Sequence, residues 1–172
     1  MSRAFVSESN TETAADVLPD LPQSPHPNYV TKSGLSALEK RLNAAQDELR
    51  KLTDAPSDPA KDLRIAHLQR DIRYLEGRIE RAILVDPAQQ PTDEVAFGAV
   101  VEVTDANGQS HRFAIVGEDE ADAERGKVSW VSPLARALIG AEVGDVVQWR
   151  RPAGELELEI RSIRYPERAN GR

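Results

Sequence analysis

The sequence has no cysteine and few aromatic residues, which make up 5% of its 172 residues. Without cysteine, disulfides and thiolate zinc sites are excluded. No stretch approaches the run of about 18 consecutive apolar residues that a membrane-spanning helix needs. The first ten residues, MSRAFVSESN, contain no apolar leader segment. We therefore expect a cytoplasmic protein that does not cross a membrane and has a core of modest size.

The net charge of −7 is unevenly distributed along the chain. Residues 29–85 hold eleven basic and nine acidic side chains, whereas residues 86–172 hold ten basic and sixteen acidic ones. Strong autonomous binding to nucleic acid draws most of its affinity from basic contacts to phosphate. The acidic C-terminal half therefore favours a protein partner, with any contact to nucleic acid being indirect.

Residues 1–28 are rich in Ser, Thr, Asp, Glu and Pro. Such a composition buries too little apolar surface to order a chain, so it predicts a disordered N-terminal arm. The pair Phe5 and Val6 could instead dock elsewhere on the protein. Disorder is the interpretation that the composition favours.

Residues 29–85 contain two apolar seams with steps of three and four residues, which is the spacing of a coiled coil. Thr31 is placed to cap the first helix, since its hydroxyl can accept from a free amide of the first turn. Two prolines between the seams break the helical pattern. The pattern predicts an antiparallel coiled-coil hairpin with arms of about 30 to 35 Å. The first seam is Leu35, Leu38, Leu42, Ala45, Leu49 and Leu52, and the second is Ile65, Leu68, Ile72, Leu75, Ile79 and Ala82.

The C-terminal half changes from helical to strand-like periodicity after a proline-bounded linker, residues 86–94. Residues 95–166 contain five β-rich runs, and the first two flank Asn107-Gly108, a strong hairpin signal because both residues tolerate positive φ. Residues 167–172 form a short tail. The sequence thus predicts an α+β chain in which a helical hairpin precedes a small β-sheet domain.

One short helix is expected within the sheet domain, at SPLARALIG, residues 132–140. Ser132 can cap it, Pro133 suits the first helical position, and Gly140 can close its C-terminus. Leu134 and Leu138 would then pack on the sheet.

At these residues the chain resembles the Gre family of bacterial transcription elongation factors. The similarity is carried by YVTKSGLSALEKRL at 29–42, LEGRIERAILVD at 75–86, VGEDEAD at 116–122, SPLARALIG, and EIRSIRY at 159–165. It implies a C-terminal domain similar to FK506-binding proteins. It also implies that this domain docks on bacterial RNA polymerase while the hairpin enters the secondary channel of the enzyme.

The resemblance leaves the role of the predicted tip open. In the cleavage factors of the family, acidic tip residues help to hold a second Mg²⁺ in the polymerase active site, and the candidates here are Asp54, Asp58 and Asp62. The segment TDAPSDPAKDL lacks the family pattern G-D-L-x-E-N, and each arm is shorter by about one heptad, or about 10 Å. The alternatives are a structural turn, as in the short-hairpin Rnk-type members, and a retained metal-holding tip. We expect the structural turn, no cofactor of the chain's own beyond a possible shared Mg²⁺, and no catalytic residue.

The resemblance also implies a polymerase-docking surface, for which the candidates are Ser132, Pro133, Leu134, Arg136, Asp119 and Glu120. The two acidic residues belong to GEDEAD, which could equally be a solvated loop. We expect the chain to act as a monomer and as an accessory factor, not as an enzyme.

Two features of the second predicted helix, both outside its apolar seam, have competing interpretations. Gly77 falls at an outward position, which close approach of the C-terminal domain or tolerated drift could explain. The arginines are expected on a solvated flank, with contact to RNA or to acidic channel walls as the alternative. They are Arg64, Arg70, Arg73, Arg78 and Arg81.

Two other classes of function are compatible with the architecture. The hairpin could be a self-association device in a non-transcriptional interaction module, which exposed apolar residues at outward positions would favour. The likeness to FK506-binding proteins suggests prolyl isomerase activity, but two tryptophans and three phenylalanines are too few for an aromatic-lined proline pocket.

Overall fold

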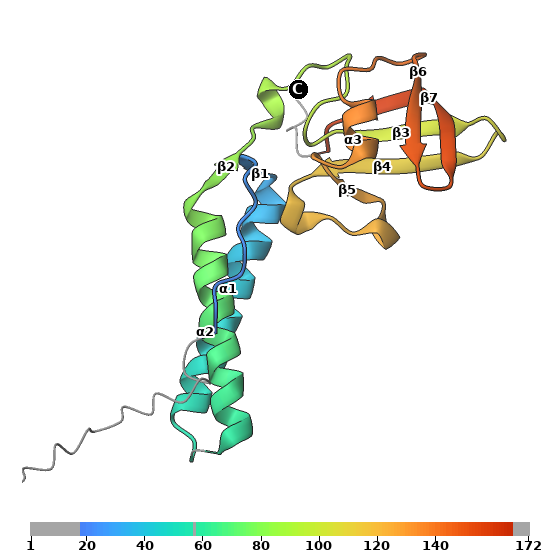
Figure 1. Ribbon diagram of the computed structural model, residues 1–172. Helices are drawn as coiled ribbons and strands as arrows, with labels where there is room; N and C mark the ends of the chain where they lie inside the picture. The colour runs from blue at the N-terminus through green and yellow to red at the C-terminus, as the bar shows by residue number, and fades with distance from the viewer. Residues whose placement is uncertain (1–17, 57, 167–172) are drawn as a thin grey trace, which may run out of the picture.

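The computed structural model describes residues 18–56 and 58–166, which form a helical rod joined at one end to a curled β-sheet (Figure 1). The predicted fold, a helical hairpin followed by a sheet domain with one short helix, is confirmed. None of the described helices is both long and apolar enough to cross a bilayer.

The rod consists of two antiparallel helices, α1 (Lys32–Thr53) and α2 (Pro59–Glu80), each of 22 residues. At a rise of about 1.5 Å per residue, each is about 33 Å long, within the predicted range. The hydroxyl of Thr31 accepts from the amide of Gly34 at 2.9 Å, so the predicted cap of α1 is present.

The two seams face each other along the rod. Leu38, Leu68 and Leu75 are fully buried, and the other seam residues are half-buried because a two-helix rod has only one internal face. The last predicted member, Ala82, is not helical. It begins strand β2 (Ala82–Leu84), although its side chain still packs on the buried cluster of Val30, Leu38 and Leu75.

The two ends of the hairpin are joined by a pair of strands that the sequence patterns did not predict. Strand β1 (Asn28–Val30) pairs in parallel with β2, with Asn28 opposite Ala82 and Val30 opposite Leu84. Each strand has three residues, which is too short for a period-two pattern to be recognised. The strands form because the start of α1 and the end of α2 lie side by side.

Residues 18–28, hereafter the N-terminal segment, also differ from the predicted disordered arm. They run along α2 (Figure 1), and hydrogen bonds to Arg73 and to the Tyr74 carbonyl tie them to that helix. The prediction from composition did not take account of an existing helix, which supplies hydrogen-bond partners to this segment. Phe5 and Val6 lie outside the described residues, as does the predicted tail.

The linker contains one short 3₁₀ turn, η1 (Pro87–Gln89), in which the Asp86 carboxylate accepts from the amide of Ala88. The linker is tied to the sheet domain by Tyr165, whose hydroxyl donates to the carbonyl of Glu94 at 2.7 Å.

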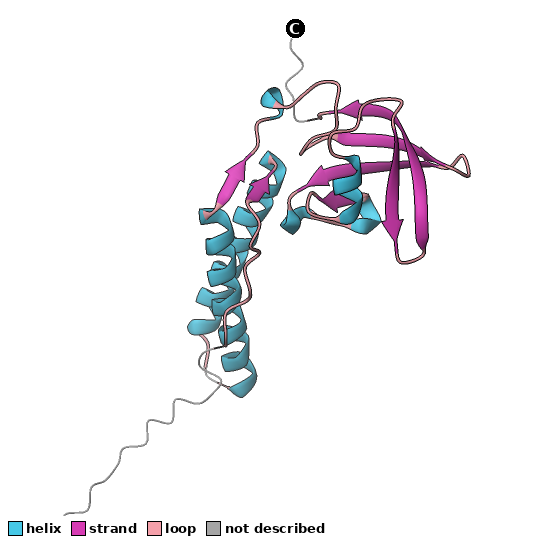
Figure 2. Ribbon diagram, turned by 45° about the horizontal axis from the view of Figure 1, so that its top comes forward, coloured by secondary structure: helices cyan, strands magenta, loops and turns pink. Residues whose placement is uncertain are grey.

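The sheet has five strands in the order β5-β4-β3-β7-β6. Figure 2 draws the strands in magenta and shows them crossing beside the helical rod. Neighbouring strands are antiparallel except β4 and β5, which are parallel. The sheet is curled. Two strands separate β4 from β6 in the sheet, yet the ring centres of Phe113 in β4 and Trp149 in β6 are only 6.2 Å apart. The strands are β3 (Val100–Asp105), β4 (Ser110–Val116), β5 (Lys127–Ser129), β6 (Val146–Arg151) and β7 (Gly154–Arg164).

The turn between β3 and β4 lies at the predicted position but has a different form. Gly108 has a φ of 78°, whereas no described residue other than glycine has a positive φ, so Asn107 does not adopt the expected left-handed conformation. The Asp105 carboxylate instead accepts from the amides of Asn107 and Gln109. This side-chain cap makes a wider turn than a two-residue hairpin.

Helix α3 (Pro133–Leu138) covers the sheet domain's core, and two 3₁₀ turns, η2 (Glu118–Glu120) and η3 (Ala123–Arg125), lie between β4 and β5. Leu134, Ala135 and Leu138 of α3 are buried against Val101, Val103, Ile115, Leu158 and Ile160 of the sheet. This cluster is separate from the one inside the rod.

Candidate functional site

The tip of the hairpin is a capped turn. The Asp58 carboxylate accepts from the amides of Ala60 at 2.9 Å and Lys61 at 3.0 Å, which makes it the N-cap of α2. The Lys61 ammonium donates back across the turn to the carbonyl of Ala55. Asp54 is the C-cap of α1, with its backbone amide directed at the carbonyls of Arg50 and Leu52.

The tip does not present a preformed cluster of metal ligands. Mg²⁺ requires oxygen ligands at about 2.1 Å in near-octahedral order. One of the three predicted carboxylates, that of Asp58, already accepts two amides, and the positive Lys61 ammonium spans the same turn. Within residues 18–56 and 58–166, no group of three or more His, Asp or Glu side chains is arranged to hold a metal ion. Among its described residues, the tip therefore offers no preformed metal site made by this chain alone.

The start of α3 has the predicted geometry. The hydroxyl of Ser132 accepts from the amide of Ala135 at 3.2 Å, and Pro133 occupies the first helical position. Pro133 and Arg136 are exposed, whereas Leu134 is only 4% exposed and belongs to the core. Of the predicted docking residues on this helix, Leu134 is thus unavailable to a partner.

Exposed apolar side chains follow α3 into β6. Ile139 is 40%, Val143 59% and Val146 57% exposed, and they stand within eight residues of one another. With Pro133 and Arg136, the stretch from residue 133 to residue 146 thus carries several exposed apolar side chains and an exposed cation, besides the exposed carboxylates of Glu142 and Asp145.

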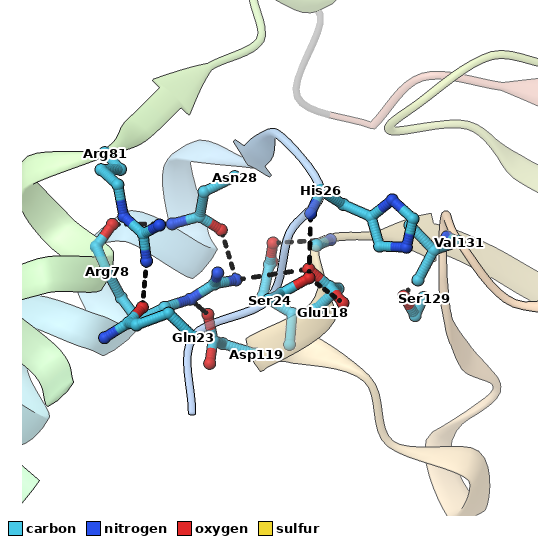
Figure 3. A network of polar contacts seen from close by, with 12 residues as sticks. Gln23, Ser24, His26, Asn28, Arg78, Arg81, Glu118, Asp119, Ser129 and Val131 are labelled. Carbon is cyan, nitrogen blue, oxygen red and sulfur yellow. Dashed lines mark hydrogen bonds and ion pairs between the residues drawn. The ribbon is translucent and has the colours of Figure 1, made fainter. Parts of the chain in front are cut away.

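Asp119, the fifth predicted docking residue, lies at the junction between the rod and the sheet domain (Figure 3). One carboxylate oxygen accepts from Nε of Arg78 at 2.6 Å, and the other accepts from the hydroxyl of Tyr74 at 3.0 Å. The Arg78 side chain is only 1% exposed and also donates to the side-chain oxygen of Asn28 at 2.5 Å. Burial, followed by the neighbouring Asp119 carboxylate, raises the pKa of Tyr74 above its usual range.

Arg78 differs from the other predicted flank residues of α2, which are half-buried or exposed. It stands three residues after the buried Leu75, next to the seam, where the η2 loop packs on the rod. A buried guanidinium is tolerated there because a carboxylate and an amide oxygen replace its water.

Glu120 also serves this junction. Its carboxylate accepts from the hydroxyl of Thr31 at 2.5 Å and from the amides of Thr31 and Gly117 at 3.2 Å. A Cβ on Gly34 would lie 2.0 Å from the Glu120 carboxyl carbon, so any other residue there would displace the Glu120 carboxylate from its present position. The carboxylates of Asp119 and Glu120 are therefore occupied within the chain.

The sequence analysis did not predict the contacts between the rod and the sheet domain. Two glycines within the helices were a signal that another part of the chain packs closely on them. Gly34 marks the close approach of the sheet domain. Gly77, for which that explanation was considered, instead faces the N-terminal segment: a Cβ there would lie 3.0 Å from Nε2 of Gln23. Glycine within a helix costs about 1 kcal/mol relative to alanine, and at both positions a packed side chain accounts for it.

Comparison with known proteins identifies the chain. Residues 90–165 match the family model for the C-terminal part of the transcription elongation factors GreA and GreB. Transcription elongation factor GreB of Neisseria meningitidis serogroup A is 37% identical over 153 residues, which cover 80% of this chain and 94% of that protein. The chain belongs to the GreA/GreB family of transcription elongation factors.

Other members of the Gre family are similar over nearly their whole length. Transcription elongation factor GreA of Nautilia profundicola is 33% identical over 157 residues, 83% of this chain and 97% of that protein. The crystal structure of the GreA factor homolog 1 protein of Thermus thermophilus superposes with a TM-score of 0.40. The match covers 81% of this chain and 99% of that chain, with 26% sequence identity. The family assignment rests on the sequence relatives and on the matched C-terminal region.

Proposed function

We propose that this Gre-family chain is a monomeric accessory factor that binds bacterial RNA polymerase at the secondary channel and modulates elongation with little stimulation of transcript cleavage. The C-terminal domain docks on the polymerase and the hairpin occupies the channel, in the manner of the short-hairpin Rnk-type members. The observation that carries the proposal is the state of the tip, where Asp58 caps α2 and Lys61 closes the turn.

The chemistry of the tip argues against cleavage. A carboxylate that accepts two amides would have to give up the cap in order to bind a metal, and losing a helix cap costs about 1 kcal/mol. The Lys61 ammonium would also stand beside the bound cation and repel it. Asp54 and Asp62 are exposed, but two carboxylates, one at the C-cap of α1 and one in the first turn of α2, make a weaker ligand set than three.

Docking through the connection from α3 to β6 is supported by exposure and chemistry. Pro133, Ile139, Val143 and Val146 offer apolar area, which a protein partner can bury. Arg136 offers a guanidinium to a carboxylate of the partner. Asp119 and Glu120 are omitted from this surface because the junction occupies them.

The proposal is tested with the cognate polymerase. Binding of the full chain to core enzyme is measured by co-sedimentation, and transcript cleavage is then followed in a backtracked complex at saturating Mg²⁺. We expect binding with little increase in cleavage. A variant with Asp54→Asn, Asp58→Asn and Asp62→Asn should behave in the same way, since asparagine at position 58 still caps the helix and removes only the charge.

The two mechanisms predict opposite results in this assay. A cleavage factor would strongly stimulate hydrolysis, and the triple variant would lose that stimulation while still binding polymerase. That pair of results would make the aspartates the working tip. Failure to bind core polymerase at all would refute the proposed function itself.

A further inference from the structure

The N-terminal segment contacts both parts of the molecule (Figure 3). We propose that residues 18–28 act as an intramolecular strap that fixes the angle between the hairpin and the C-terminal domain. This inference goes beyond the proposed function, because it concerns the chain's own conformation and holds whether or not polymerase binds.

The first half of the segment is fastened to α2. The Asp20 carboxylate pairs with Nε of Arg73 at 2.6 Å, and the Leu18 carbonyl accepts from the same guanidinium at 3.1 Å. Gln23 donates to the carbonyl of Tyr74 at 3.1 Å and accepts from the guanidinium of Arg81. These contacts follow one face of α2 over two turns.

Gly77 lies beneath this attachment. Because it has no side chain, Gln23 reaches the helix backbone there, and a Cβ would stand 3.0 Å from Nε2 of Gln23. The absence of a side chain at Gly77 therefore leaves room for Gln23 against the helix.

The second half of the segment reaches the C-terminal domain. The Ser24 hydroxyl donates to the Glu118 carboxylate of η2 at 3.0 Å. The His26 and Trp130 rings pack in a T-shaped arrangement with their centres 6.0 Å apart. Asn28 adds two contacts with the buried Arg78, accepting from its guanidinium and donating to its carbonyl at 2.7 Å.

The segment thus spans the junction from the hairpin side to the sheet side. Relative motion is the default for two domains joined by a small polar interface. A third element bonded to both restricts that motion. The contacts with Arg73 and Arg81 are exposed, those of Gln23 with Tyr74 and of Ser24 with Glu118 are part-buried, and the two Asn28 contacts with Arg78 are buried. Exposed and part-buried polar contacts are individually weak, so a charge added at Ser24 can break the link from the segment to the sheet domain.

The test measures the angle directly. Since the chain has no cysteine, Lys51→Cys near the tip and Arg112→Cys on β4, both exposed positions, place one spin label on each part. Pulsed electron paramagnetic resonance then reports the distribution of distances between the labels. The otherwise unchanged chain should give one narrow distribution.

Two variants release the strap by different means. Ser24→Glu sets a second carboxylate against Glu118, and Gly77→Leu fills the space that Gln23 occupies while keeping a good helix former. Each should broaden the distribution about twofold, as expected for domains free to move. Gln89→Glu, which adds the same charge at an exposed linker position, should leave it unchanged.

A compensating change sharpens the result. Adding Glu118→Gln to Ser24→Glu removes the repulsion and should restore the narrow distribution. The proposal is overturned if Ser24→Glu and Gly77→Leu both keep the parent distribution, or if the Gln89→Glu control broadens it equally. Far-UV circular dichroism of each variant reports whether the helices persist, so Ser24→Glu decides the matter even if Gly77→Leu unfolds the hairpin.

Discussion

Arg78 has the least accessible charged side chain among residues 18–56 and 58–166. Its Nη1 atom has no hydrogen-bond partner there, and its charge is balanced chiefly by Asp119 at 2.6 Å, with Glu118 at 3.7 Å. Desolvating a guanidinium is costly, so the pair contributes less to net stability than its short distance suggests. Removing either Arg78 or Asp119 from the pair should nevertheless lower the stability of the junction strongly.

Replacing Asp119 with alanine is therefore expected to destabilise the chain by about 3 kcal/mol, because it leaves a buried cation unpaired. The measurement is urea unfolding followed by helical circular dichroism. Glu159→Ala is the matched control, since it breaks the exposed Arg161–Glu159 pair of 2.7 Å and should cost less than about 1 kcal/mol.

A second variant separates charge burial from packing. In the Asp119→Ala background, Arg78→Met removes the unpaired charge and should recover much of the lost stability. Equal losses for Asp119→Ala and Glu159→Ala would contradict this account of the junction.

At the scale of elements, aspartates in this chain serve repeatedly as caps of turns and short helices. Each accepts from backbone amides that the element itself leaves free. Asp58 at the tip is one of this set, which gives its carboxylate an ordinary structural task. The others include Asp86, Asp105 and Asp122.

Asp105, the cap of the turn between β3 and β4, should make the stability of the sheet domain depend on pH. The hydrogen bond from His111, followed by the Gln109 amide, lowers the pKa of Asp105 below its usual value. A carboxyl with a lowered folded-state pKa contributes stability above its unfolded-state pKa and loses it as pH falls through the folded-state pKa. Stability should thus fall below about pH 4.

Urea midpoints measured between pH 6 and pH 2 test this expectation. Asp105→Asn keeps an oxygen that can accept from the turn amides but cannot ionise, so its midpoint should change less with pH than that of the parent. His111→Ala should also reduce the acid dependence, because it removes the main cause of the lowered pKa. An acid dependence unchanged in Asp105→Asn would assign it to other carboxylates.

At the scale of the whole molecule, the tip and the sheet domain lie at opposite ends of the rod (Figure 1). The connection from α3 to β6 is on the sheet domain. A partner that engages both ends must match the distance and angle that the junction sets. A rigid junction lowers the entropy that such binding loses, which favours affinity.

The proposed docking through α3 and its connection to β6 predicts that changes at exposed residues of α3 weaken polymerase binding without affecting folding. Arg136→Glu reverses an exposed charge, and Pro133→Ala removes exposed apolar area. The charge reversal is expected to raise the dissociation constant about tenfold or more, as for loss of a well-placed charged contact. Arg161→Glu, an equal charge reversal on β7, is the control.

Co-sedimentation gives the affinities, and thermal unfolding verifies that the variants are folded. Equal binding by the Arg136→Glu variant and the parent would place the docking surface elsewhere.

The sequence by itself determined the elements whose signals are local. The seam spacing, the Thr31 and Ser132 caps and the strand periodicities depend on residues within a few positions of one another. The start of α3 was predictable for the same reason, since Ser132 and Pro133 act on their own helix.

Only the tertiary structure decided the rest. The burial of Arg78, the occupation of Asp119 and Glu120, the packing of the N-terminal segment and the pairing of β1 with β2 join residues that are about 40 to 90 positions apart. Propensity and periodicity carry no information on such contacts, because they arise from the way separate surfaces meet. The local sequence around Asp119 fits an exposed acidic loop as well as a buried ion-pair partner. Only the position of Arg78 opposite it shows that Asp119 is the second of these.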